Sequence, residues 1–279
     1  MTNPLDALPL VCPHDGLSLL RDRQVLRCAA GHVFDIARQG HANVLPVGRK
    51  ASRDPGDSVD MVRARRNVLD SGFLAPLRDA LIEHPAIVAA LDANALVVDA
   101  GCGDGYYTAA LAERWPRCAM LGIDVSKHAI RMAAQRHREV AWLVASNRRL
   151  PVVPGACDLI LSLFGFACWD VWAEHQRDEQ CVVSVDPGPR HLIELRERIY
   201  DRVRLHAPPA RAAAQAAGYR LHDERALSVE RRDVPMAQLL AMTPHGHRAT
   251  PAAREQLLER PPSSMTIDVV VRTWRRCPP

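Results

Sequence analysis

Three glycines and two carboxylates near the middle of the chain could hold a positively charged ligand. In the stretch VVDAGCGDGYYT, Asp99 ends an apolar run, a glycine-rich turn follows, and Asp104 lies inside that turn. Glycines let the backbone bend sharply and let a ligand lie directly against it. The two carboxylates disfavour a pyrophosphate and favour a cofactor that carries ammonium and sulfonium charges, which indicates S-adenosylmethionine. The glycines of this turn are Gly101, Gly103 and Gly105.

A further carboxylate, Asp124, follows the next apolar run, which reads LGID. A carboxylate at this place can accept hydrogen bonds from both ribose hydroxyls of an adenosine, as it does in dinucleotide-binding folds. A glycine turn by itself is also a common structural turn. Here the turn, its acidic flank and Asp124 occur in the order that a cofactor site requires, so we predict that S-adenosylmethionine binds at this turn.

A second set of residues with chemical potential lies near the N-terminus, in LVCPHDGLSLLRDRQVLRCAAGH (residues 10–32). Zn²⁺ takes four ligands in a tetrahedron and accepts thiolate, imidazole and carboxylate groups. The spacing predicts a zinc site in which Asp15 stands where a second cysteine is usual. The alternative is a metal-free module held by apolar packing. The predicted ligands are Cys12, Asp15, Cys28 and His32.

The elements that must position these residues alternate between strand and helix. This alternation predicts a parallel sheet covered on both faces, which is a Rossmann-like α/β fold, and a small β-rich module at residues 9–47 precedes it. Ser126 is the expected N-cap of the second helix. Strands are predicted at 95–100, 118–124, 140–146, 157–164, 180–186 and 266–274, and helices at 106–115, 126–137 and 190–203.

Residues 59–91 have helical periodicity that is interrupted at Gly72 and Pro76. A basic stretch at residues 49–66 leads into this segment, and it could attract phosphate or form a solvated helix face. Its basic residues are Arg49, Lys50, Arg53, Arg63, Arg65 and Arg66. The predicted units are a zinc-ribbon-like module (1–48), a basic helical linker (49–92) and a Rossmann-like domain (93–279).

The composition of the chain limits the class of protein to which it can belong. The chain has 279 residues, of which 48% are hydrophobic and 24% charged, and this is ordinary for a globular protein. We see no signal peptide and no apolar stretch long enough to cross a bilayer, so we expect a cytoplasmic protein with no membrane partner. Without a secretory signal, the eight cysteines are expected to be thiols or metal ligands rather than disulfides.

Several stretches occur together in an order that is typical of one family. They include CAAGHVFDIARQGHANVLP, SRDPGDSVDMVRARRNVLDSGFLAPLRDAL, DAGCGDGYYT, DPGPRHLIELRERIY and MTPHGHRA. Together they resemble the bacterial large-subunit ribosomal RNA guanine-N1 methyltransferases, which carry an N-terminal zinc module before a Rossmann-like methyltransferase domain. The resemblance covers nearly the whole chain, and SRDPGDS and PGPRHL are its most specific parts.

The resemblance implies an enzyme that transfers a methyl group from S-adenosylmethionine to N1 of a guanine in a hairpin of large-subunit (23S) ribosomal RNA. It also implies a homodimer. It places three residues at zinc positions, namely Cys12, Cys28 and His32. It places four residues on or beside the cofactor, namely Gly103, Asp104, Asp124 and His191.

The sequence departs from the family pattern at three places. Asp15 replaces the second zinc cysteine, and Leu74, beside Phe73, replaces an aromatic residue that contacts the cofactor. The third departure is the segment SLFGFACWD (162–170), where the family has a short Arg-Ile-Tyr-Ala-Pro-like segment. In Rossmann-like methyltransferases this loop meets the target base, so the departure bears on the substrate.

Guanine N1 carries a proton that must leave before N1 can attack a methyl group, so a base is needed within hydrogen-bond reach. His191 and Asp186 come at or after the end of the fifth strand, and we predict that one of them acts as this catalytic residue. Two alternatives stay open: a small-molecule S-adenosylmethionine-dependent methyltransferase, and a non-catalytic RNA-binding ribosome-assembly factor. The residues predicted to contact RNA phosphates are Arg63, Arg65 and Arg66.

Overall fold

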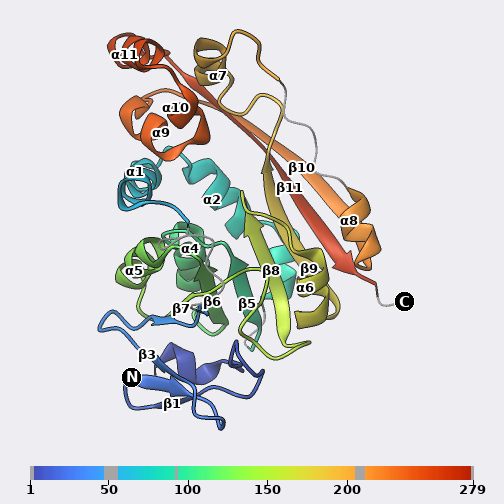
Figure 1. The fold of residues 1–279 in the computed structure, drawn as a ribbon. Coiled ribbons are helices and arrows are strands. Elements are labelled where there is room, and N and C mark those ends of the chain that lie inside the picture. The colour runs from blue at the N-terminus through green and yellow to red at the C-terminus, as the bar shows by residue number, and fades with distance from the viewer. Residues whose placement is uncertain (1–2, 47–55, 92–93, 205–210, 278–279) are drawn as a thin grey trace.

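The computed structural model describes residues 3–46, 56–91, 94–204 and 211–277. Its main sheet contains β4 (Ala42–Asn43), β5 (Leu96–Ala100), β6 (Ala119–Asp124), β7 (Ala141–Val144), β8 (Cys157–Leu163), β9 (Gln176–Pro187), β10 (Tyr219–Arg231) and β11 (Met265–Arg276). The order is β10-β11-β9-β8-β5-β6-β7-β4 (Figure 1). The six strands from β9 to β4 pair in parallel, as predicted, but β11 is antiparallel to both of its neighbours.

Helices cover this sheet, and α7, α9, α10 and α11 lie together at one end of the molecule (Figure 1). Ser126 caps α5 as predicted, because its hydroxyl accepts the N–H of Ala129 at 3.3 Å. Pro76 lies in the first turn of α2, where a missing N–H leaves no bond unmade, so it begins a helix instead of interrupting one. The helices are α1 (Val59–Asp70), α2 (Ala75–Ile82), α3 (Pro85–Ala90), α4 (Tyr106–Arg114), α5 (Lys127–Arg136), α6 (Trp169–His175), α7 (Ile193–Ile199), α8 (Arg211–Ala216), α9 (Met236–Met242), α10 (Pro244–Arg248) and α11 (Pro251–Glu259).

The order of the strands creates one crevice for a ligand. The chain runs from β5 through β6 to β7 on one side, and β8 then returns to pair with β5 on the other side. The helices that follow β5 and β8 therefore lead away from each other at the carboxyl ends of these strands. Ligands of doubly wound folds bind at such a switch point.

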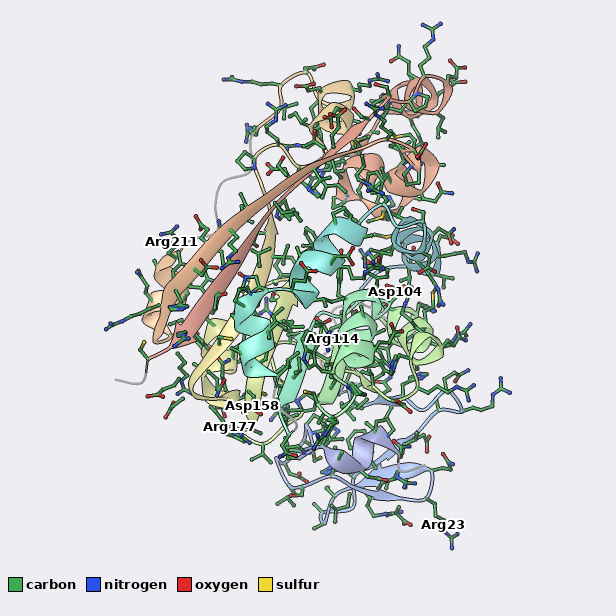
Figure 2. All side chains as sticks on the ribbon, turned by 180° about the vertical axis from the view of Figure 1, so that it is seen from behind. Arg23, Asp104, Arg114, Asp158, Arg177 and Arg211 are labelled. Atoms are coloured by element: carbon green, nitrogen blue, oxygen red, sulfur yellow. The ribbon has the colours of Figure 1, made fainter. Side chains whose placement is uncertain are left out.

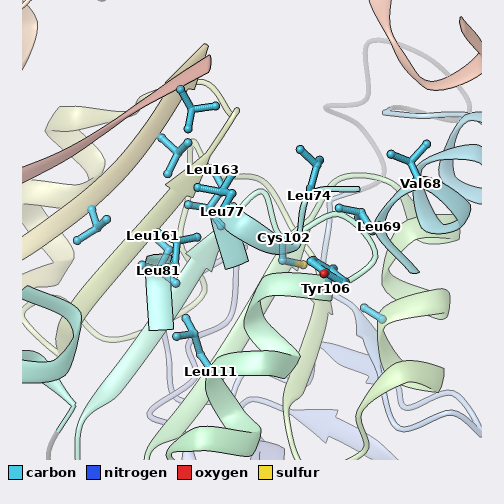
Figure 3. Packing of buried hydrophobic residues seen from close by; sticks show 14 of the residues in the cluster. Val68, Leu69, Leu74, Leu77, Leu81, Cys102, Tyr106, Leu111, Leu161 and Leu163 are labelled. Atoms are coloured by element: carbon cyan, nitrogen blue, oxygen red, sulfur yellow. The ribbon is translucent and has the colours of Figure 1, made fainter. Parts of the chain in front are cut away.

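Two apolar layers hold the sheet, and successive residues of its strands alternate between them. Val97 and Leu161 face one layer, where they meet buried leucines of the helices, while Val98 and Ile160 face the other. Figure 3 shows part of the first layer, including Leu77, Leu81, Leu111 and Leu161. Because both faces are covered, β5 and β8 are buried along their whole length.

A buried carboxylate joins the starts of three strands. Asp158 of β8 accepts the backbone N–H of Leu96 of β5 at 2.8 Å and pairs with Arg177 of β9, also at 2.8 Å (Figure 2). This arrangement fixes the register at the end of the sheet that is opposite the crevice.

The N-terminal region is β-rich, as predicted, and it packs on the main sheet. A small antiparallel sheet contains β1 (Leu20–Asp22), β2 (Val25–Arg27) and β3 (Val33–Asp35). Leu10 forms a bridge to Val152, and β4 pairs with β7 as an edge strand of the main sheet. The module therefore shares a sheet with the domain that follows it. No helix within the described ranges is long and apolar enough to span a membrane.

Candidate active site and metal centre

A glycine turn joins β5 to α4 at the carboxyl edge of the sheet, as the sequence predicts. The backbone N–H groups of Gly101 and Cys102 both donate to the carbonyl oxygen of Ile123 at 2.9 Å, which fixes the turn against β6. The three glycines of the turn have φ angles of 112°, 57° and 77° in chain order. A Cβ at Gly105 would stand 2.5 Å from the ring of Trp142, so this position admits no side chain.

Asp99 is a buried carboxylate at the base of this turn. The hydroxyl of Thr108 in α4 donates to its Oδ2 at 2.5 Å, whereas Oδ1 is buried with no hydrogen-bond partner among the described residues. Burial raises the pKa of Asp99 to about 7; the bond from Thr108 lowers this pKa, and the charge of Asp124 raises it further. A buried carboxylate oxygen without a partner, such as Oδ1 of Asp99, is suited to accept a hydrogen bond from a cationic group of a ligand.

Asp124 ends β6 and lies on the wall of the same crevice. Its Oδ2 accepts the N–H of Gly103 at 3.1 Å, and its Oδ1 accepts the N–H of Ser126 at 2.8 Å. Burial raises the pKa of Asp124, and the two backbone hydrogen bonds counteract this rise. Each oxygen keeps acceptor capacity for a ligand hydroxyl, in agreement with the predicted ribose contact.

Asp104 is paired within the protein. Arg136 of α5 lies 2.5 Å from its carboxylate and also lies 5.5 Å from the centre of the Tyr106 ring. The acidic flank that the sequence presents is therefore partly neutralised, and Asp104 mainly ties the turn to α5. The preference of the site for a cationic ligand then depends on Asp99 and Asp124.

The turn borders a cavity of about 760 Å³, a size typical of small-molecule sites, which run from roughly 300 to 1,000 Å³. Of the residues predicted to hold the cofactor, Gly105 alone is absent from the cavity wall, since it supports the turn from behind. Leu74 lines the cavity, and Figure 3 shows it near Cys102 of the turn and Tyr106 of α4. The predicted residues on the wall are Leu74, Asp99, Gly101, Gly103, Asp104, Asp124 and His191.

The far end of the cavity is formed by the loop after β8, by the PGPRHL loop and by α9 and α10. His191 lies there with its ring centre 5.9 Å from that of Phe164, and its Nδ1 accepts the backbone N–H of Asp268 at 3.3 Å. The side chains at this end include Phe164, Phe166, His191, Met242, His245 and Arg248.

The structure does not bring Asp186 into this cavity. Its carboxylate pairs with Arg272 of the neighbouring strand β11 at 3.0 Å, and it is not among the lining residues. Burial raises the pKa of Asp186, and Arg272 opposes that rise. A carboxylate held in this way joins β9 to β11, so of the two predicted catalytic residues His191 alone lies at the site.

The basic residues of the stretch at 49–66, called the basic stripe below, have different surroundings. Arg63 is exposed, whereas Arg65 lies on the cavity wall and pairs with Asp57 at 2.5 Å. Arg66 pairs with Asp70 at 3.4 Å. The remaining basic residues of the stripe, Arg49, Lys50 and Arg53, lie outside the described residues.

Sequence reasoning missed several residues of the cavity. Tyr107 lies two residues after Gly105, in the first turn of α4, and no local pattern in the sequence marks it as a cavity residue. Asp57, on the cavity wall, was also missed; its carbonyl oxygen accepts the hydroxyl of Ser126 at 2.9 Å, which places this part of the predicted linker at the crevice. The stretch MTPHGHRA contributed to the resemblance without any assigned role, although it forms one wall of the far end.

The four predicted zinc ligands converge in the N-terminal module. Their ligand atoms all lie within 4.8 Å of one another. The His32 Nδ1 lies 2.9 Å from Asp15 Oδ2 and 3.4 Å from Cys28 Sγ, and it lies 3.5 Å from Cys12 Sγ. Two sulfurs, one imidazole and one carboxylate at these separations fit a tetrahedral Zn²⁺ site, with Asp15 as the fourth ligand.

Two family models match the chain. One, described as "RlmA, N-terminal" and named as a zinc ribbon, matches residues 10–53. The other, described as "Methyltransferase domain", matches residues 97–179. With the cavity described above, these matches establish an S-adenosylmethionine-dependent methyltransferase that carries an N-terminal zinc ribbon.

Individual relatives agree with these models. A Micromonospora griseorubida protein named "Putative 23S rRNA (guanine-N(1)-)-methyltransferase" is 32% identical over 98% of this chain and 99% of its own length. The 23S rRNA (guanine(748)-N(1))-methyltransferase of Streptomyces fradiae is 36% identical over 67% of this chain and 66% of its own length. Among solved structures, a chain from the complex of the Haloferax volcanii Trm112 methyltransferase activator with a methyltransferase has a TM-score of 0.51 at 17% identity, covering 81% of this chain and 99% of that chain, which shows a likeness of fold alone.

Proposed function

This chain belongs to the family of 23S rRNA guanine-N1 methyltransferases, and we propose that it transfers the methyl group of S-adenosylmethionine to N1 of a guanine in a hairpin of 23S rRNA. The relationship over 98% of the chain to the M. griseorubida protein of that name carries the proposal. A relationship limited to the cofactor motifs would fit many methyltransferases, but this one extends from the zinc ribbon to the last strand.

The two ends of the cavity differ in chemistry, and this difference suits two different reactants. The glycine turn and the carboxylates of Asp99 and Asp124 lie at one end, where they would hold the cofactor. Aromatic and imidazole side chains line the other end. S-adenosylmethionine supplies a methyl group on a cationic sulfur. Holding an acceptor in line with that group removes much of the barrier to displacement.

The acceptor end presents aromatic surface at the place where the sequence departs from its family. Phe166 is 91% exposed, and Phe164 has a φ of 57°, which is uncommon for a bulky residue. Asn147 donates to the carbonyl oxygen of Phe166 at 2.8 Å and accepts the indole N–H of Trp172 at 2.7 Å, so the loop is anchored. An unstacked base can lie against such a ring, which supports a nucleobase as the acceptor.

His191 is our proposed catalytic residue at guanine N1. It lies beside Phe164, and the backbone N–H of Asp268 donates to its Nδ1, so the neutral ring keeps its own proton on Nε2. From Nε2 it would donate to O6 of the guanine, which stabilises the anion formed when the N1 proton leaves to water. The loop that carries it is rigidly built, because Arg196 is buried and donates to the carbonyl oxygens of Pro189 and His191 at 3.0 and 3.2 Å. We do not extend this role to Asp186, which is held by Arg272 outside the cavity.

The zinc ribbon and the exposed part of the basic stripe are proposed to bind the RNA around the target. Cys12, Asp15, Cys28 and His32 would hold the metal, which would stabilise the folded module. Arg63, exposed on α1, remains a candidate for a phosphate contact. Work on ribosomal RNA implies a cytoplasmic location, and the homodimer that the resemblance suggests remains a prediction.

A competition for methyl label tests the proposal against its two alternatives. The protein would be incubated with tritium-labelled S-adenosylmethionine and with unmodified 23S rRNA, a metabolite extract, or both. We expect label in the RNA, together with a reverse-transcription stop at one guanine, because a methyl group on N1 blocks base pairing. Label in metabolites alone would support the small-molecule enzyme, and binding of RNA without any transfer would support the assembly factor.

A further inference from the structure

A histidine and a tyrosine meet at the far end of the cavity, where α7 and α10 pack together (Figure 1). His245, in α10, lines the cavity wall. Its Nδ1 lies 3.0 Å from the hydroxyl oxygen of Tyr200, the residue that follows α7, and the two rings meet edge to face with their centres 5.7 Å apart. Because Nδ1 faces Tyr200, any contact of this ring with a bound base must be made through Nε2.

The backbone that carries His245 is tightly fixed. Gly246 packs so closely on α9 that a Cβ would stand 1.8 Å from the carbonyl oxygen of Leu240. The buried hydroxyl of Thr243 accepts the N–H of Gly246 at 3.3 Å and donates to the carbonyl oxygen of Leu239 at 2.7 Å. Arg254 of α11 donates to the carbonyl oxygen of Gly246 at 2.6 Å. A side chain on so constrained a turn is suited to act on a substrate with a defined geometry.

The two histidines of the cavity differ in the partner of their Nδ1 atoms. The backbone N–H of Asp268 can only donate, so the neutral ring of His191 keeps its proton on Nε2. A phenol can also accept, because its hydroxyl hydrogen is able to turn away. The hydroxyl of Tyr200 can therefore accept from Nδ1 of His245, which makes Nε2 an acceptor, and this bond persists when Nε2 gains a proton. His191 is thus suited to donate a hydrogen bond, and His245 is suited to take up a proton.

We propose that His245 is the general base that receives the N1 proton of the guanine, and that Tyr200 is its positioning residue; this inference rests on the proposed function. As the N1 proton leaves to water, Nε2 of His245 takes a proton from that water. The electron pair left on N1 forms the bond to the methyl group, and the bond between that group and the sulfur breaks with its pair going to the sulfur. The positive charge of the sulfonium is thereby replaced by that of the imidazolium.

Single-turnover methyl transfer to 23S rRNA by the full chain tests the role of His245. A general base typically contributes 10²- to 10⁴-fold, so His245→Ala should slow transfer about 100- to 10,000-fold. Imidazole added to the buffer should raise the rate of this variant about tenfold or more, because it supplies the missing base. The matched control is His247→Ala, which should leave the rate unchanged, since His247 is exposed on the same helix and is not among the lining residues.

A steady-state measurement tests the role of Tyr200. Tyr200→Phe keeps the aromatic ring and removes the hydroxyl that accepts from Nδ1 of His245. We expect kcat to fall about tenfold while KM for the RNA stays within about twofold, because Tyr200 acts through His245 and does not line the cavity. An unchanged kcat, or a rise in KM that equals the fall in kcat, would overturn this role.

Each outcome for His245→Ala decides the assignment. Calorimetry with S-adenosylhomocysteine reports whether the variant folds its cavity, and Tyr200→Phe still decides if His245→Ala does not fold. An unchanged rate of transfer, or a loss that imidazole does not restore, would overturn the inference alone as long as the natural protein methylates guanine N1. If the natural protein transfers no methyl group to this atom, the proposed function fails and this inference fails with it.

Discussion

Asp99→Asn should make the protein more stable and a poorer binder of its cofactor. The fully buried carboxylate has a pKa of about 7, against an ordinary value of 3.8. Because this pKa is higher in the folded state, the folded protein holds a proton that the unfolded chain releases between these two values. The stability of the natural protein must therefore fall as the pH rises through this window, by about 1.4 kcal/mol per pH unit.

The size of the effect follows from the rise of about 3 in the pKa of Asp99. Relative to Asp99→Asn, the natural protein should be less stable by about 2 kcal/mol at pH 5.5 and by about 4 kcal/mol at pH 8. Asparagine keeps an acceptor for Thr108, so the hydrogen bond to Oδ2 need not be lost. Exposed Asp35 supplies the control, since Asp35→Asn should change stability little and equally at both pH values.

Urea unfolding at several pH values measures this difference directly, and calorimetry at pH 8 measures the affinity for S-adenosylmethionine. We expect the cofactor to bind Asp99→Asn about 10- to 100-fold more weakly, because the amide cannot pair with an ammonium group. A difference in stability that is the same at pH 5.5 and pH 8 would refute the reasoning about the buried charge. Unchanged affinity would refute the role assigned to Asp99.

Three further predictions concern the metal, the turn and the acceptor. Asp15→Cys should tighten zinc binding, measured by competition with a chromophoric chelator, because thiolate is a softer ligand than carboxylate; weaker binding would count against Asp15 as the fourth ligand. Gly105→Ala should destabilise the fold by about 2–5 kcal/mol in urea unfolding, since its Cβ meets Trp142, and Gly155→Ala, strained but unobstructed, should cost only about 1–2 kcal/mol; equal losses would exclude the clash. Phe166→Ala should raise KM for the RNA about tenfold without changing affinity for S-adenosylmethionine, and an unchanged KM would remove Phe166 from the acceptor site.

The cofactor turn could be predicted from the sequence because it is a local structure. Asp99, the glycines and Asp124 belong to two consecutive strand–turn–helix units, and parallel pairing of β5 with β6 brings their ends together. The zinc ligands were equally accessible, since Cys12 and Cys28 each begin a short ligand pair. In both cases spacing along the chain fixes position in space.

Contacts between distant segments could not be predicted in this way. Arg136 of α5 neutralises Asp104, and Arg272 of β11 pairs with Asp186 outside the cavity. No local pattern in the sequence specifies either pairing. The strand β10 was missed because its many charged residues lie on an exposed edge of the sheet, where apolar alternation is weak. For the same reason, Arg65 reads as one member of a basic stripe until the fold places it over the glycine turn.

The most direct measurement is a nucleoside analysis of 23S rRNA after reaction with S-adenosylmethionine that carries a deuterated methyl group. The RNA would be digested after incubation with the purified protein, and its nucleosides would be separated and weighed by mass spectrometry. The account predicts deuterated 1-methylguanosine as the labelled nucleoside. Label on any other nucleoside, on another atom of guanosine, or on no RNA component at all would contradict it.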